Sequence, residues 1–224
     1  MTRLTGKTVV VTAGGTREPI DAVRFIGNRS SGRMGVAIAA EARRRGAAVT
    51  LIAANLAVDE PEGVDVVETP TAADVARETL ARADADVIVM AAAVADYRPA
   101  EPIEAKRPKD DQPWRLELEP TADVLRALAE QRANGGVVVG FAAEAGEDGL
   151  ARAREKQARK KADLLVYNDV SASGVGFDAA ENEVVIISEE GERHVARAPK
   201  ERVAAEILDE VERLLGRNGE RAAG

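Results

Sequence analysis

The residues best suited to chemistry stand close together in the segment GNRSSGRMG, residues 27–35. Ser30 and Ser31 are good N-cap residues, because a serine oxygen accepts hydrogen bonds from the free N–H groups of a first helical turn. The positive end of a helix attracts phosphate, and Gly32 and Gly35 leave room for a ligand to approach the backbone. The segment therefore predicts either an anion-binding helix start or an ordinary capped helix.

Two further features near or after this segment suit an anionic ligand. Asn28 carries a neutral amide that both donates and accepts. Lys156 and Lys160 stand four residues apart in a basic run, so they share one face of a predicted helix. A solvated basic face is the alternative explanation for the lysines.

The elements that position these residues follow from the hydrophobic pattern. Apolar, β-branched runs alternate with amphipathic segments, which is typical of a doubly wound, mostly parallel, Rossmann-like α/β sheet with helices on both faces. A β-hairpin is predicted late in the chain, across residues 183–198. We expect strands at 7–13, 47–54, 63–68, 86–93, 137–142 and 163–167, and helices at 30–45, 71–83, 121–133, 148–162 and 201–215.

The alternation is interrupted after the fourth strand. Residues 97–113 contain four prolines among charges and show no periodicity, so we expect a mobile linker or functional flap. Residues 115–119 alternate and are compatible with a strand. We expect one domain over residues 1–216 and a flexible tail over 217–224.

Composition limits the classes of function. The net charge of −8 argues against a nucleic-acid-binding surface, and no apolar run is long enough to span a membrane. The N-terminus lacks the apolar core of a signal peptide. Cysteine is absent, which excludes disulfides and thiolate catalysis by the chain itself. We expect a cytoplasmic protein.

A doubly wound sheet with an early glycine loop raises the possibility of an NAD(P)-dependent oxidoreductase. The first turn reads AGGTRE, residues 13–18, and lacks the Gly-x-Gly-x-x-Gly fingerprint. The second strand ends without the carboxylate that binds a ribose diol. The dinucleotide interpretation is therefore disfavoured.

Five motifs in order resemble phosphopantothenate–cysteine ligase, the ligase domain of the bifunctional coenzyme A biosynthesis protein. The resemblance covers residues 6–215. The motifs are TAGGTREPID at 12–21, VRFIGNRSSGRMG at 23–35, AAAVADYR at 91–98, VGFAAE at 139–144 and NDV at 168–170.

The resemblance implies a two-step ligase reaction. A nucleoside triphosphate, CTP in most bacterial members and ATP in eukaryotic ones, activates the carboxylate of 4′-phosphopantothenate as an acyl nucleotide. The amine of L-cysteine then attacks and gives 4′-phosphopantothenoylcysteine. Mg²⁺ accompanies the triphosphate, and family members are dimers. With no flavin-dependent decarboxylase half in this sequence, we expect a free-standing ligase or an excised half.

The resemblance also implies roles for individual residues. Asn28 matches the asparagine that holds the acyl nucleotide, and Lys106 matches a catalytic lysine of the flap. Asp96 is also a candidate ligand of the metal. The expected nucleotide-binding residues are Gly14, Gly15, Ser30, Gly32, Gly35, Ala92, Ala93, Asp96, Asp123, Phe141, Lys156 and Lys160.

The chain departs from the family pattern in two places. The flap reads KRPK at 106–109 where the family has Lys-x-Lys-Lys, so Lys109 can share the role of Lys106. The family often has Asn-Pro-Asp-Ile where this chain has TADV, residues 121–124. The role that the family implies there therefore transfers securely only to Asp123. The altered flap favours an alternative hypothesis, a nucleotide-binding regulatory module that has lost the chemistry.

Several points remain open at the level of sequence. The sequence does not distinguish CTP from ATP as the nucleotide. It also leaves open whether the flap covers the site of its own chain or that of a neighbouring chain. For a homodimer, the candidate contacts are the region after the fourth strand and the hairpin, through Val184, Ile186 and Val195. Trp114 is expected to anchor the flap.

Overall fold

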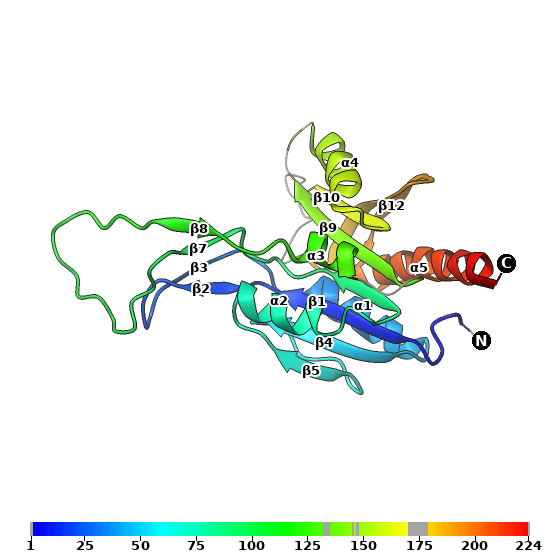
Figure 1. The fold of residues 1–224 in the computed structure, drawn as a ribbon, viewed down its shortest axis with the longest axis horizontal. Helices are drawn as coiled ribbons and strands as arrows, with labels where there is room; N and C mark the ends of the chain where they lie inside the picture. The colour runs from blue at the N-terminus through cyan, green and yellow to red at the C-terminus, as the bar shows by residue number, and fades with distance from the viewer. Residues whose placement is uncertain (1, 132–134, 145, 147, 170–178, 224) are drawn as a thin grey trace.

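An eight-stranded, mostly parallel sheet forms the centre of the protein in a computed structural model that describes residues 2–131, 135–144, 146, 148–169 and 179–223 (Figure 1). Six neighbouring strands are parallel, and an antiparallel hairpin completes one edge, which confirms the predicted sheet and the late hairpin. In spatial order the strands are β5 (Asp65–Glu68), β4 (Ala48–Ala54), β1 (Thr8–Gly14), β6 (Val87–Met90), β9 (Val137–Glu144), β10 (Leu164–Asp169), β11 (Glu181–Ser188) and β12 (Gly191–Pro199).

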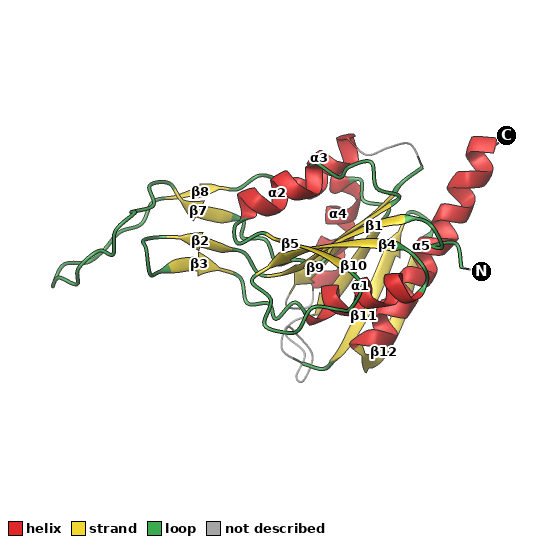
Figure 2. Ribbon diagram, turned by 90° about the horizontal axis from the view of Figure 1, so that it is seen from below, coloured by secondary structure: helices red, strands yellow, loops and turns green. Residues whose placement is uncertain are grey.

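Helices cover both faces of the sheet, as predicted (Figures 1 and 2). On one face lie α1 (Arg33–Arg44) and α5 (Lys200–Ala223), which pack against each other. The other face carries α2 (Ala72–Leu80), α3 (Val124–Gln131) and α4 (Gly149–Lys160). No helix in the described part of the chain is long and apolar enough to cross a bilayer.

Burial on both faces explains why the central strands are continuously apolar. In β1, Val9 and Val11 point into the core beneath α1 and α5, whereas Val10 points into the core beneath α2 and α3. All three side chains are at most 3 % exposed. Residues that alternate in direction along one strand are therefore all buried.

The start of α1 differs from the predicted serine cap. Gly32 is the N-cap residue, with φ 83°, and no side chain caps the helix. Ser30 Oγ instead accepts from Gly32 N at 3.3 Å, before the helix begins. A Cβ on Gly32 would lie 2.3 Å from Leu56 Cδ2. Gly32 thus allows a positive φ and close packing on Leu56, which local capping preferences do not report.

The C-terminal helix is longer than the sequence pattern indicates. It continues to Ala223, past the predicted end at residue 215, so the polar segment from 217 is helical as far as it is described. Leu214 and Leu215 pack against the core, and Asn218 Nδ2 donates to Gly135 O at 3.2 Å. The polar composition of this segment therefore did not end the helix.

Two small antiparallel sheets form an arm, residues 17–27 and 97–120, that projects from the central sheet (Figures 1 and 2). One pairs β2 (Arg17–Pro19) with β3 (Phe25–Gly27), which the sequence did not predict. The other pairs β7 (Tyr97–Pro99) with β8 (Leu118–Pro120), so the strand expected at 115–119 begins later. The predicted flap is the loop between β7 and β8.

Asp21 fastens the flap to the turn between β2 and β3. Its side chain accepts hydrogen bonds from the N–H groups of Val23 (2.9 Å), Arg24 (2.8 Å) and Arg107 (3.3 Å) and pairs with the Arg24 guanidinium. Burial raises the pKa of Asp21, but these donors outweigh that effect and lower it. Trp114 lies under Arg24 and Arg107, 5.5 and 4.7 Å from its ring centroid. Trp114 therefore helps to anchor the flap.

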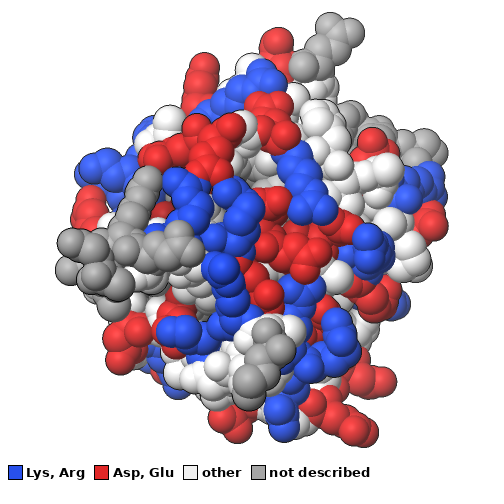
Figure 3. All heavy atoms as spheres, turned by 90° about the vertical axis from the view of Figure 1, so that its right-hand side faces the viewer, with Lys and Arg blue, Asp and Glu red and all other residues white. Residues whose placement is uncertain are grey.

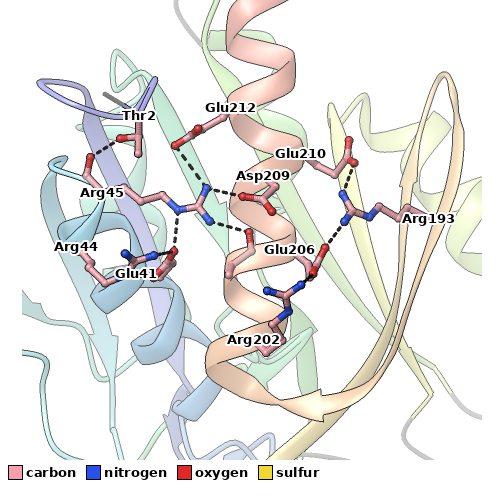
Figure 4. A network of polar contacts seen from close by, with 11 residues as sticks. Thr2, Glu41, Arg44, Arg45, Arg193, Arg202, Glu206, Asp209, Glu210 and Glu212 are labelled. Atoms are coloured by element: carbon pink, nitrogen blue, oxygen red, sulfur yellow. Dashed lines mark hydrogen bonds and ion pairs between the residues drawn. The ribbon is translucent and has the colours of Figure 1, made fainter.

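An ion-pair network joins α1 to α5 (Figure 4). The Arg45 side chain, 7 % exposed, reaches from the end of α1 to Glu41 (2.8 Å), Asp209 (2.8 Å) and Glu212 (3.4 Å). It also donates to Ala205 O at 3.0 Å. On the face shown in Figure 3, basic and acidic side chains are intermixed, so neither sign of charge dominates it.

Candidate active site

A cavity of about 660 Å³ opens at the carboxyl ends of the parallel strands, beside the switch in strand order between β1 and β6. Ligands of open α/β sheets bind at this position. Most of the site residues expected from the resemblance line it together. They are Asn28, Ser30, Gly32, Gly35, Ala92, Ala93, Asp96, Asp123, Phe141, Lys156 and Lys160.

Gly14 and Gly15 do not line the cavity. A Cβ on Gly14, which has φ 89°, would lie 1.9 Å from Ala54 O, and one on Gly15 would lie 2.6 Å from Asn28 O. Both glycines let the loop after β1 pass under neighbouring backbone. Gly35 has a similar role, since its Cβ would lie 2.5 Å from Ala13 Cβ. Close packing of the chain on itself accounts for these glycines.

Lys106 lies outside the cavity, in the flap at the end of the arm, where its side chain is exposed. The flap extends away from the sheet that carries the cavity (Figure 1). The structure therefore does not bring the expected flap lysine to the other site residues of the same chain.

Asn28 follows β3 and bridges two loops. Its Nδ2 donates to Val94 O at 3.0 Å, in the loop after β6. The side chain is exposed at the cavity wall, so a bound ligand can contact the amide. A neutral amide tolerates an anion here, whereas a carboxylate would repel it.

Three threonines hold the loop after β6 in place, and two of them, Thr12 and Thr16, are buried. Thr12 Oγ1 accepts from Ala92 N at 3.0 Å, and Thr16 Oγ1 accepts from Ala95 N at 3.0 Å. Thr121 Oγ1 donates to Ala95 O at 2.6 Å. The backbone that faces the cavity is thereby fixed before a ligand arrives. No role for these three hydroxyls was expected from the sequence.

Lys156 and Lys160 reach the cavity from one face of α4, as their spacing predicted. Lys160 pairs with Asp123, just before α3. Lys156 Nζ donates to Phe141 O at 3.3 Å. Burial lowers the pKa of Lys156, an effect that the nearby charge of Glu144 partly opposes. A partly buried ammonium group gains more from an anionic ligand than an exposed one does.

Lys156→Met should weaken nucleoside triphosphate binding roughly 10- to 100-fold, because a hydrogen bond to a charged partner is lost. Thermal stability should hold or rise, since the apolar side chain removes a desolvated charge. Titration calorimetry and a melting scan measure the two effects. Arg159→Met, on the same helix but outside the cavity, is the matched control and should bind normally. Equal affinity in both variants would remove Lys156 from the binding site.

The cavity wall also contains polar residues for which the sequence predicted no individual role, among them Asn168 of β10, Asn182 of β11 and Lys200 of α5. The position of Asn168 at a strand end was a signal for the ligand-binding edge. Asn182 and Lys200 had no such signal, because only the folded hairpin and α5 bring them to this wall.

Asp96 is the cavity carboxylate best placed for a metal. Its side chain is exposed, whereas Asp123 already pairs with Lys160. The described residues contain no group of three or more His, Cys, Asp or Glu side chains that could hold a metal. One carboxylate nevertheless fits Mg²⁺ that arrives with a triphosphate, because Mg²⁺ takes most of its remaining ligands from phosphates and water.

Comparison with known proteins places this site in a family. Residues 4–215 match the family model described as DNA/pantothenate metabolism flavoprotein C-terminal domain. The chain belongs to this family. It is 42 % identical over 222 residues to the coenzyme A biosynthesis bifunctional protein CoaBC of Bacillus subtilis, covering 98 % of the chain and 54 % of the relative. The CoaBC of Mycobacterium tuberculosis is 45 % identical over 220 residues, covering 93 % and 52 %.

A solved structure agrees with the family membership. The C-terminal domain of CoaBC superposes with a TM-score of 0.81 at 34 % identity, covering 96 % of this chain and 99 % of that domain. The resemblance inferred from the five motifs is thus confirmed, as is the α/β fold. The chain spans about half the length of the curated relatives it matches.

Proposed function

We propose that the chain is a phosphopantothenate–cysteine ligase. The observation that carries the proposal is the cavity, which gathers Asn28, the start of α1, the loop after β6 and two lysines of α4 at one edge of the sheet. Its relatives are named for coenzyme A biosynthesis.

The arrangement suits the activation of a carboxylate by a triphosphate. The carboxylate oxygen attacks the α-phosphorus, pyrophosphate leaves, and an acyl nucleotide forms. Two anions must approach each other in this step, so donors and cations have to offset their repulsion. Asn28 supplies a neutral donor beside the reacting groups, and Lys156 and Lys160 supply positive charge for the phosphates.

The second step forms the amide bond. The neutral amine of L-cysteine attacks the acyl carbon, the bond from carbon to phosphate oxygen breaks, the nucleoside monophosphate leaves with the bonding electrons, and the nitrogen loses a proton to solvent. Mg²⁺, held by Asp96 and the phosphates, would neutralise negative charge during the first step. Backbone groups at Ala92 and Ala93 contact the nucleotide in this proposal.

Pyrophosphate release that depends on 4′-phosphopantothenate tests the function directly. Wild-type protein with Mg²⁺ should release pyrophosphate with CTP or ATP, and cysteine should then yield 4′-phosphopantothenoylcysteine. A melting scan with each nucleotide identifies the preferred base, since stabilisation grows with [L]/Kd. A shift with NADP alone would exclude the ligase.

One observation supports the alternative hypothesis of a nucleotide-binding regulatory module, namely that Lys106 lies outside the cavity. A module that lacks the chemistry would bind the triphosphate without releasing pyrophosphate. We instead propose that Lys106 serves the cavity of a second copy within a homodimer, because the arm carries it away from its own site. A mixture of Lys106→Gln chains and Asn28→Asp chains should then regain activity in part of the dimers. In a heterodimer of the two variants, one site combines the wild-type Asn28 of one chain with the wild-type Lys106 of the other.

The dimer contact is expected on the arm and not on the late hairpin. Val184, Ile186 and Val195, the apolar face proposed for the hairpin contact, are at most 7 % exposed and belong to the core beneath α5. The arm includes the other candidate contact region, which follows the fourth predicted strand, together with the β2–β3 hairpin. Among the described residues, the exposed large apolar side chains all lie on the arm: Val23, Phe25, Tyr97, Ile103, Leu116 and Leu118.

Light scattering at micromolar concentration should give twice the chain mass of 23.7 kDa. The double variant Phe25→Glu, Leu118→Glu should give the monomer mass, because two charges then lie on the apolar surface that pairs. Glu183→Arg, an exposed position on the hairpin, is the control and should remain dimeric. A dimer that survives the arm variant but dissociates with Glu183→Arg would assign the interface to the hairpin.

A further inference from the structure

Asn55, the residue that follows β4, has an unusual backbone conformation. Its φ is 49°, and Lys161 is the one other non-glycine residue with a positive φ among those that the structure describes. Most L-amino acids adopt this left-handed region only at a cost, whereas asparagine tolerates it. Asn55 is half-buried and does not line the cavity. Its amide therefore has a role other than contact with a ligand.

The Asn55 amide joins two loops that are far apart in sequence. Its Nδ2 donates to Gly15 O and to Pro70 O, at 3.0 Å in both cases. An amide nitrogen carries two hydrogen atoms, so both donors are used. Arg17 N donates to the same Pro70 O at 2.9 Å. The loops after β1, β4 and β5 are thereby fastened to one another at the carboxyl edge of the sheet.

The loop after β1 lies directly against the backbone of Asn28. A Cβ on Gly15 would lie 2.6 Å from Asn28 O, and one on Gly27 would lie 2.4 Å from Thr16 O. The two stretches of backbone are therefore in contact, with no side chain between them. Close-packed groups leave little room to absorb a displacement. A shift of Gly15 is consequently passed on to Asn28.

The same loop also positions the hydrogen-bond acceptor of the Asn28 side chain. Ala93 N donates to Gly14 O at 2.8 Å, and Thr16 N donates to Ala93 O at 3.3 Å. The next residue, Val94, accepts from Asn28 Nδ2 at 3.0 Å. The loop after β1 therefore supports both sides of this contact. Its position determines where the Asn28 amide meets a ligand in the cavity.

We propose that Asn55 is a positioning residue of the ligase, which holds Asn28 in place for carboxylate activation through the backbone of Gly15. The inference rests on the proposed ligase function and extends the machinery beyond the residues that line the cavity. Asn55 touches no substrate, so it governs the placement of the Asn28 donor and leaves phosphate binding by the lysines of α4 unaffected. A misplacement of about 1 Å in a reacting group can lower a rate on the order of a hundredfold.

Asn55→Gly separates the amide from the backbone conformation, because glycine adopts the same positive φ but has no donors to offer. The kcat for pyrophosphate release should fall roughly 10- to 100-fold, whereas the Kd of the triphosphate should not change. Asn55→Asp is nearly isosteric and should be impaired as well, since its carboxylate would face two carbonyl oxygens. Wild-type kcat in Asn55→Gly would show that only the backbone conformation matters and would overturn the proposal.

Lys161→Gly is the matched control, because Lys161 has a similar φ of 54° but caps the end of α4 and does not line the cavity. This variant should keep the wild-type kcat. An equal loss of kcat in Lys161→Gly and Asn55→Gly would contradict the proposal, since a glycine at either positive φ would then be sufficient to cause the loss.

Coupling to Asn28 distinguishes positioning from a general loss of structure. In a chain that already carries Asn28→Asp, Asn55→Gly should lower kcat no further, because residues that act through one another have non-additive effects. Additive losses of kcat, accompanied by a lower melting temperature, would give Asn55 a purely structural role and refute the proposal.

The failure of the ligase function gives a different result. A wild-type chain that releases no pyrophosphate would refute the ligase function, and the positioning role with it. A normal kcat in Asn55→Gly beside an impaired Asn28→Asp chain would refute the positioning role alone.

Discussion

Asn28→Asp should reduce ligase turnover about a hundred- to a thousandfold, which corresponds to about 3 to 4 kcal/mol for one well-placed donor. The substitution is nearly isosteric, but it removes the donor that Asn28 Nδ2 provides to Val94 O. It also places a carboxylate beside an anionic carboxyl group and phosphate. Like charges repel more strongly in a cavity partly closed to water than in bulk solvent.

The substitution should affect the reaction more than the binding of the triphosphate, because the amide is proposed to hold the acyl nucleotide. Nucleotide titration beside product formation with cysteine separates the two quantities. Asn218→Asp is the matched control, since Asn218 also donates an amide N–H to a backbone carbonyl, at 3.2 Å from Gly135 O, far along α5. Wild-type turnover in Asn28→Asp would make Asn28 a structural loop residue.

Arg45→Met should destabilise the fold by about 3 to 5 kcal/mol, the usual effect of removing one partner from a buried ion pair. The Arg45 side chain is 7 % exposed and is shared by Glu41 on α1 and by Asp209 and Glu212 on α5. Methionine fills part of the volume but leaves these carboxylates and Ala205 O without the guanidinium. Urea unfolding monitored by circular dichroism measures the loss.

Arg44→Met provides the matched control. Arg44 pairs with the same Glu41, but its side chain is 72 % exposed, so its removal should cost at most about 1 kcal/mol. Equal destabilisation by the two variants would show that burial and the link to α5 contribute nothing.

The pH dependence gives a second check on the Arg45 network. Hydrogen bonds from Arg44 lower the pKa of Glu41 below its ordinary value of 4.5, opposed by burial and assisted by Arg45. A carboxylate whose pKa is lowered on folding contributes stability above its unfolded pKa, and that contribution is lost as the pH falls through the folded value. The difference between wild type and Arg45→Met should therefore narrow below pH 4.5 as Glu41 becomes protonated.

The sequence by itself determined the architecture and most of the cavity lining. Strands buried on both faces are recognisable as continuous apolar runs, and their carboxyl ends must meet at one edge of a parallel sheet. That geometry places Asn28, the loop after β6, Phe141 and the start of α1 together, as the motifs implied. The spacing of Lys156 and Lys160 added the face of α4, because side chains four residues apart share a helix face.

The tertiary structure decided what depends on contacts between distant residues. The sequence indicated a ligand role for four glycines, yet a Cβ on any of them would meet another part of the chain: Gly14, Gly15, Gly32 and Gly35. The serine cap was wrong for the same reason, since Gly32 packs on Leu56 of the loop after β4. Local preferences of about 1 kcal/mol do not prevail over such packing.

The position of the flap and the polar wall also required the folded chain. Lys106 belongs to an aperiodic segment, and a hydrogen bond between Asp21 and Arg107, which are far apart in sequence, fastens that segment to the turn between β2 and β3. Asn168, Asn182 and Lys200 meet only because the antiparallel hairpin returns the chain to the edge of the sheet and starts α5 there. Sequence periodicity reports which face of an element is buried, but long-range packing decides which residues share a cavity.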